Sequence, residues 1–161
     1  MRRKLVFLVS LLTFLFIFAP VFFFLNLKSE RSNQVLEVKD SASGRVFGSW
    51  PLNEAGEFAI EFVHSVHQSP VRESFKIENK MICPLSVRFF SFGAGMQSHP
   101  EEGQSMERDG DAIVISGFST QFRELNYIVG TVSDHLLFIN GETLSLRELC
   151  GRNAHITIRI K

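Results

Sequence analysis

The sequence predicts an all-β domain, an antiparallel β-sandwich or barrel, behind a single N-terminal transmembrane helix. Three observations lead to this prediction. Residues 5–27 form one uncharged apolar run. From residue 35 onward, apolar and polar residues alternate in short segments, as they do along half-buried strands. Turn-forming residues separate these segments, and no long amphipathic helical pattern lies between them, which favours antiparallel sheets over βαβ units.

The apolar run at residues 5–27 is long enough for a helix to cross a hydrocarbon core of about 30 Å. Arg2, Arg3 and Lys4 precede it, so the positive-inside bias favours a cytoplasmic N-terminus and an extracytoplasmic C-terminal portion. A cleaved signal peptide is the alternative. The run exceeds the roughly 7–15 apolar residues of such a peptide, and no small-x-small cleavage site follows it. We therefore expect a single-pass protein of the cell membrane.

The expected organisation is a cytoplasmic tip and anchor at residues 1–27, a polar linker at 28–34 and one β-domain at 35–161. Residues 28–161 contain 14 basic and 17 acidic residues, which gives a formal charge of −3. A mildly acidic domain without basic runs argues against nucleic acid, and against anionic lipid headgroups, as a partner.

Two cysteines, Cys83 and Cys150, lie in the portion expected outside the cytoplasm. A disulfide is possible there and would stabilise the fold by about 4 kcal/mol, because it closes a long loop in the unfolded chain. Two free thiols are the alternative. Neither a CxxC pair nor a zinc-type Cys/His spacing occurs, so the sequence predicts no metal or other cofactor.

Alternating segments and turn residues locate the expected strands. Asn140-Gly141 is the strongest hairpin signal, because both central residues of a type I′ turn need a positive φ. The segment 144–149 ends in one expected helical turn, 117–125 stays open between coil and short helix, and 93–110 is expected to be a long irregular loop, either functional or disordered. The predicted strands are 35–39, 44–50, 57–65, 71–79, 85–92, 111–116, 135–139, 142–146 and 154–161.

Two ionisable residues stand on the apolar faces of the third and fourth predicted strands. His64 ends the apolar face of one strand, and Glu73 lies within the apolar face of the next. If the strands pair with Phe62 opposite Phe75, His64 lies directly opposite Glu73, with about 4.5–5.5 Å between their Cβ atoms. A shift by two residues keeps the faces and makes the pair diagonal.

Three roles for this polar pair remain open: fixing the register of the hairpin, flooring a binding pocket, or serving catalysis or a metal. A metal site needs a third ligand such as His67, His99 or His135, and no spacing demands one. Ser65 points to the face opposite His64, and no GxSxG motif occurs, so a serine nucleophile has little support.

The stretch HSVHQSPVRE (64–73) resembles the signature of the bacterial family called domain of unknown function 1850. SFGAGM (91–96) and VSDHLLF (132–138) resemble two further segments of that family, in the same order. The chain departs from the family pattern at Met96-Gln97, where Leu-Pro is expected. The family's residues map here onto His64, Ser65, Pro70, Val71, Glu73, Gly93, Ala94, Gly95 and His135.

The resemblance implies a small exported or membrane-anchored protein associated with tripartite ATP-independent periplasmic (TRAP) transporters, with a TRAP permease or its TAXI-type solute-binding protein as the expected partner. We therefore expect an extracytoplasmic accessory or binding module. His64, Ser65, Glu73 and His135 would form a polar cluster beside the segment Gly93–Gly95. The alternatives are an exported metal-dependent or acid–base hydrolase using the same groups, and a purely structural interaction domain.

Overall fold

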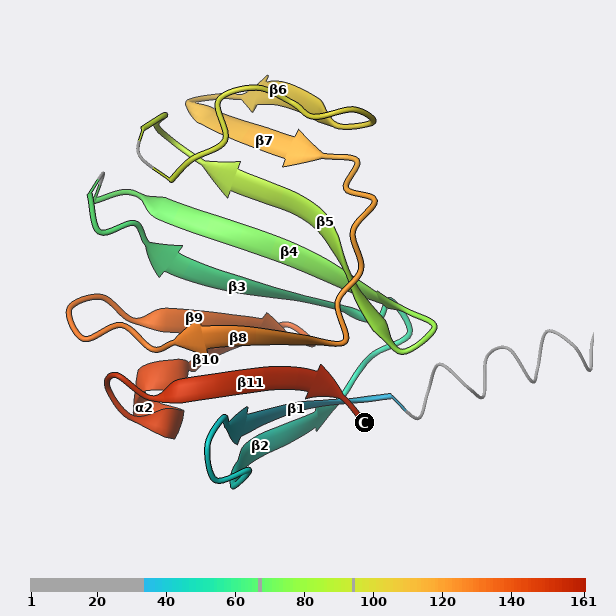
Figure 1. The fold of residues 1–161 in the computed structure, drawn as a ribbon, viewed down its shortest axis with the longest axis vertical. Coiled ribbons are helices and arrows are strands. Elements are labelled where there is room, and N and C mark those ends of the chain that lie inside the picture. Colours follow the sequence, from blue (N-terminus) through green and yellow to red (C-terminus); the bar gives the residue numbers. More distant parts are fainter. Residues whose placement is uncertain (1–33, 67, 94) are drawn as a thin grey trace, which may run out of the picture. The chain divides into compact units, whose positions relative to one another are not determined.

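The computed structural model describes residues 34–66, 68–93 and 95–161, which fold into eleven β-strands and one short α-helix (Figure 1). In chain order these are β1 (Val35–Asp40), β2 (Val46–Pro51), β3 (Glu57–Val63), β4 (Pro70–Glu78), β5 (Met81–Phe89), β6 (Ser105–Asp109), β7 (Ala112–Ser116), β8 (Glu124–Ile128), β9 (His135–Ile139), β10 (Glu142–Ser145), α2 (Leu146–Cys150) and β11 (His155–Ile160). The span expected at 5–27 lies outside these residues, and none of their helices is long and apolar enough to cross a membrane.

The strands form two antiparallel sheets, which confirms the all-β class. The four-stranded sheet has the order β2-β1-β11-β8, and the seven-stranded sheet has the order β10-β9-β3-β4-β5-β7-β6. The larger sheet has more strands than the smaller one, so the smaller sheet packs against only part of it. Apolar side chains of both sheets meet in one core, as in a β-sandwich.

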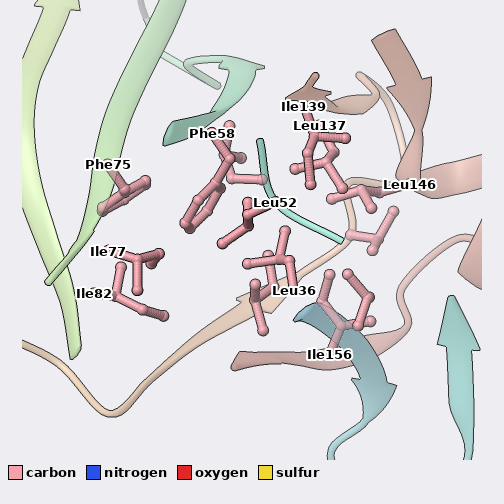
Figure 2. Packing of buried hydrophobic residues seen from close by; sticks show 14 residues of the cluster. Leu36, Leu52, Phe58, Phe75, Ile77, Ile82, Leu137, Ile139, Leu146 and Ile156 are labelled. Atoms are coloured by element: carbon pink, nitrogen blue, oxygen red, sulfur yellow. The ribbon is translucent and has the colours of Figure 1, made fainter. Parts of the chain in front are cut away.

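The main core lies between the four-stranded sheet and the β9, β3, β4 part of the other sheet (Figure 2). Leu36 and Ile156 of the smaller sheet are fully buried, and they belong to the same cluster as Phe58, Phe75 and Leu137 of the larger one. A second, smaller cluster covers the far half of the large sheet: Val71, Phe89, Ile113 and Ile115. The alternating pattern therefore placed the buried faces correctly.

The predicted Asn-Gly turn joins β9 to β10. Asn140 has a φ of 53° and Gly141 a φ of 83°, as a type I′ turn requires. The Asn140 amide also accepts a hydrogen bond from the Asn53 N–H (3.0 Å) and donates one to the Pro51 carbonyl oxygen (2.7 Å), so this turn is fixed against the end of β2. The helical turn expected within 144–149 is present as α2, whose cap is the Ser145 hydroxyl accepting from the Glu148 N–H.

The strands differ from the sequence expectations in three places. The segment 93–110, expected to be irregular, contains β6, which pairs with β7 across a turn at Gly110-Asp111. The ambiguous segment 117–125 runs into β8, a strand that was missed. β5 begins at Met81 rather than at residue 85, because Pro84 is accommodated at an irregularity in the pairing with β4.

The register predicted for the β3–β4 hairpin was also wrong. Phe58 lies opposite Phe75, and Ile60 lies opposite Glu73. The chain turns sooner than expected, since the His64 N–H donates to the Ser69 carbonyl oxygen and Gln68 adopts a φ of 51°. His64 therefore lies beyond the end of β3, four positions past the partner of Glu73, and the predicted facing pair does not form.

Cys83 lies on β5 and Cys150 in α2, and both are free thiols. The possible disulfide between them is therefore not formed in this structure. Burial raises the pKa of the Cys150 thiol to about 11, so this thiol is neutral at ordinary pH.

The two sheets are joined at one corner by an antiparallel bridge between Ile82 and Phe122. Figure 1 shows the connection at residues 117–123 running from β7 past β5 to the start of β8. Beyond the bridge, β5 pairs with β4 and β7, whereas β8 pairs with β11. The two strands thus leave the corner in different sheets, and the space between them is not filled by backbone pairing.

Candidate functional site

Glu73 is a carboxylate on the inner face of the large sheet. It lies on β4 between two apolar cross-strand neighbours, Ile60 on β3 and Val87 on β5. Burial raises the pKa of Glu73, and a hydrogen bond from Tyr127 opposes that rise. None of the ion pairs among the described residues involves Glu73. The inner face thus holds an acidic group without a cationic partner from the described part of the chain.

Tyr127 reaches Glu73 from the opposite sheet. Its hydroxyl donates to Glu73 Oε2 over 2.6 Å, which joins β8 to β4 through side chains. Burial and the neighbouring Glu73 charge raise the pKa of Tyr127, so the hydroxyl stays protonated and remains a donor. Glu73 Oε1 accepts no hydrogen bond from the described residues. It is also not fully enclosed, in contrast to the two unpartnered nitrogens of Arg147. One carboxylate oxygen therefore remains accessible.

His135 lies next to this pair, at the start of β9. Its ring stacks on Phe62, with 5.2 Å between centroids, and meets the Tyr127 ring edge-on at 6.1 Å. Burial lowers the pKa of His135, and Nδ1 accepts a hydrogen bond from the Gly130 N–H (3.1 Å), so the neutral ring carries its proton on Nε2. A Cβ on Gly130 would lie 2.2 Å from the Ser133 carbonyl oxygen, so only glycine fits there.

A cavity of about 370 Å³ opens in front of Glu73 and Tyr127, in the space between β5 and β8. Most of its lining residues are apolar, and the polar ones are Glu73, Tyr127, Asn126, Thr120 and Ser86. Apolar walls with a few convergent polar groups are typical of ligand pockets. The remaining lining residues are Phe75, Pro84, Val87, Phe118, Phe122 and Leu125.

The structure brings together only part of the predicted cluster. Glu73 and His135 are linked through Tyr127, a residue that the sequence did not single out. Tyr127 lies in β8, which was missed, and its only sequence signal is the alternation of ELNYI, where Leu125 and Tyr127 share the inner face. Glu73, on the apolar face as predicted, is the central residue of the site.

The other predicted residues lie at the loop end of the β3–β4 hairpin. His64 Nδ1 accepts from the Val66 N–H (3.3 Å), and Ser65 is exposed, its carbonyl oxygen accepting from the Gln68 side chain. A Cβ on Gly95, which has a φ of 85°, would lie 3.7 Å from His64 Nε2. Gly93 is exposed at the start of the same loop. His64 and Gly95 thus lie close together, and among the described residues the hydrogen bond of the Glu73 side chain is made with Tyr127 rather than with either of them.

The arrangement can bind the polar group of a ligand at Glu73 Oε1, while the apolar walls of the cavity surround the carbon atoms of that ligand. Within the described residues no group of three or more His, Cys, Asp or Glu side chains is placed to hold a metal ion. His67, considered as a metal ligand from the sequence, lies outside those residues. His99 is exposed and hydrogen-bonded to Ser98 through Nδ1 (2.7 Å).

Comparison with known proteins adds one assignment to this geometry. No curated protein and no solved structure matches the chain. Residues 58–146 match the family described as Domain of unknown function (DUF1850). They run from the second residue of β3 through β10 and include Tyr127, His135 and the cross-strand neighbours of Glu73. On the strength of that match, which covers more than half of the sequence, the chain belongs to the DUF1850 family.

Proposed function

We propose that this domain is an extracytoplasmic binding module, anchored in the membrane by its N-terminal segment, whose site is the cavity in front of Glu73. The observation that carries the proposal is the half-buried carboxylate of Glu73, a residue that lines a mostly apolar cavity. One of its oxygens is held by Tyr127, the other accepts no hydrogen bond from the described residues, and no cation among them pairs with either. A site of this kind selects ligands that bring a positive charge or a strong hydrogen-bond donor.

The chemistry of the ligand follows from the cost of burying Glu73. A carboxylate without a compensating charge is destabilising inside a protein, and one hydrogen bond from Tyr127 offsets only part of that cost. A primary ammonium or guanidinium group at Oε1 offsets the rest. The aromatic walls, including Phe118 and Phe122, suit the methylene groups that carry such a cation.

A role beside a TRAP-type solute uptake system completes the proposal. It is supported by the resemblance of three motifs to a family associated with such transporters and by the expected anchor at residues 5–27. In this role the module binds a group of the permease or of its solute-binding protein, or a small solute passing between them.

The binding site is tested with the full-length chain in lipid nanodiscs and a simple probe, n-butylammonium, titrated by calorimetry or by chemical-shift changes. We expect Glu73→Gln to weaken binding by about tenfold or more, because the probe loses its charged partner. Glu61→Gln is the matched control, since Glu61 is a carboxylate on β3 that already faces Arg72 at 3.8 Å. Equal effects of the two substitutions, or no binding by the unaltered chain, would contradict the site.

The association with a transporter is tested separately. The full-length chain is purified from native membranes in a mild detergent, and its retained partners are identified. Retention of a TRAP permease or its solute-binding protein, reduced by Glu73→Gln and unchanged by Glu61→Gln, is the expected result. If neither protein is retained, the transport role is wrong. The binding site is tested by the titration and does not depend on this result.

A further inference from the structure

We infer that the cavity receives its cationic group as a side chain of a partner protein, from an extended segment that adds to the open edge of β8. This inference rests on the proposed function, because it uses the same carboxylate, and it goes further by specifying how the partner binds. In strand addition the main chain of the partner supplies affinity, and pockets for alternate side chains supply specificity.

The free edge of β8 follows from its pairing with β11. The Val129 N–H donates to the Ala154 carbonyl oxygen, on the β11 side. Backbone groups alternate in direction along a strand, so the N–H and C=O groups of Leu125 and Tyr127 also point toward β11. The N–H and C=O groups of Glu124, Asn126 and Ile128 therefore point away from β11. Within the described residues no strand pairs with β8 on that side.

The same edge already makes one backbone pair. Phe122, two residues before β8, exchanges both hydrogen bonds with Ile82: Ile82 N–H to Phe122 O over 2.7 Å, and Phe122 N–H to Ile82 O over 2.9 Å. Phe122 has the alternation of Glu124 and Asn126, so all three present their backbone groups to the same side. Among the described residues, backbone pairing on this side is therefore made at Phe122 and is not continued along β8.

The β8 edge also lacks the features by which other edge strands of this domain avoid pairing. β2 ends in Pro51 and has an irregular register, β6 carries Glu107, Arg108 and Asp109, and β10 has only four residues. β8 has one charged residue, and its flanks expose apolar surface: Ile128 is 54% exposed and Phe122 is 37% exposed. An edge of this composition is open to a further strand.

The cavity lies where the side chains of an added strand would point. Leu125 and Tyr127 extend from β8 into the interior and line the cavity, with Glu73 behind them. A strand paired with β8 would lie about 4.8 Å away, and every second side chain would point inward on the same side as Tyr127. One such side chain, a lysine or arginine, reaches Glu73 Oε1, and its apolar neighbours cover Phe122 and Ile128. The partner segment is therefore an extended, β-branched stretch with one cation.

The inference is tested with peptides of about nine residues, displayed as a random library around a fixed central lysine, and panned on the full-length chain in nanodiscs. An enriched peptide is then synthesised and its affinity is measured by fluorescence anisotropy. Asn126→Pro removes an outward N–H while leaving the β8–β11 hydrogen bonds intact, and Asn126→Ala is its matched control. We expect about a tenfold loss of affinity for the proline variant relative to the alanine variant.

A second measurement needs no variant of the protein. Single amides of the peptide are N-methylated in turn, and a strand paired on one side loses affinity at every second position. Loss at every position, at none, or an equal effect of Asn126→Pro and Asn126→Ala would overturn strand addition. Replacing the central lysine by norleucine tests the carboxylate: its effect should disappear in Glu73→Gln. If n-butylammonium binds through Glu73 and no peptide pairs with β8, strand addition fails and the binding site stands.

Discussion

The hydrogen bond between Tyr127 and Glu73 provides the most direct test of how the two sheets are joined. Tyr127→Phe removes the hydroxyl and keeps the ring, which packs on the main core and on His135. A hydrogen bond to a charged acceptor contributes about 1.5–3 kcal/mol, and one between neutral groups about 0.5–1.5 kcal/mol. The bond is 2.6 Å long and its acceptor is half-buried, so we expect the upper part of each range.

The loss should depend on pH because Glu73 changes its charge. Burial places the pKa of Glu73 in the native state above its ordinary value of 4.5. Between pH 4.5 and the native pKa, Glu73 keeps its proton in the folded chain and loses it in the unfolded chain. The free energy of unfolding therefore falls as the pH rises through this range, and the Tyr127 hydroxyl makes that fall smaller because it stabilises the ionised carboxylate. Without the hydroxyl the native pKa of Glu73 rises further. The destabilisation by Tyr127→Phe should thus be about 1 kcal/mol larger at pH 8 than at pH 4.

The measurement is urea unfolding of the full-length chain in detergent micelles at both pH values, followed by the fluorescence of Trp50, the only tryptophan. Trp50 packs against the main core and reports on its loss. The double variant Glu73→Gln/Tyr127→Phe completes a mutant cycle. A coupling free energy below about 0.5 kcal/mol at pH 8, or a destabilisation that is equal at the two pH values, would show that this bond does not join the sheets.

Three further predictions concern the surroundings of the site. Because burial lowers the pKa of His135 below 6.5, the unfolded chain binds a proton first, so the free energy of unfolding should fall as the pH drops below 6.5; His135→Gln should reduce this dependence in the same urea assay. Gly130→Ala should lower the melting temperature strongly, since its Cβ would lie 2.2 Å from the Ser133 carbonyl oxygen, whereas the exposed neighbour Thr131→Ala should have little effect. Arg147→Met should stabilise the domain by about 1–3 kcal/mol in urea unfolding, because the enclosed Nε and Nη2 of Arg147 have no hydrogen-bond partner among the described residues. A loss of stability would show that these two nitrogens do have a partner.

Which residues are buried could be predicted from the sequence far better than which residues meet. Period-two alternation placed Glu73 on the inner face, and the Asn140-Gly141 turn was correct in type and position. The register of β3 and β4 was not determined by that alternation. Shifting one strand by an even number of residues keeps every side chain on its face, so the length of the turn decides the partners. The predicted contact of His64 with Glu73 failed for this reason alone.

Tyr127 could not be found in the same way. Its strand is short, follows a segment with no clear periodicity, and pairs with β11 near the end of the chain. The contact with Glu73 joins residues 54 positions apart and belonging to different sheets. Such contacts depend on how the sheets pack, and local patterns contain no information about that packing. The polar partner of Glu73 was therefore expected to be a histidine of the adjacent strand, and it is a tyrosine of the opposite sheet.

The connection between β7 and β8 lines the cavity and takes little part in the backbone pairing of the two sheets. Phe118, Thr120 and Phe122 line the cavity from a segment that contributes only the Ile82–Phe122 bridge to the backbone pairing. Substitutions at Phe118 and Thr120 can enlarge, close or polarise the cavity while both sheets keep their hydrogen bonds. If the cavity is the binding site proposed above, a few residues of this one connection determine its shape and polarity, while Glu73 is held separately on β4.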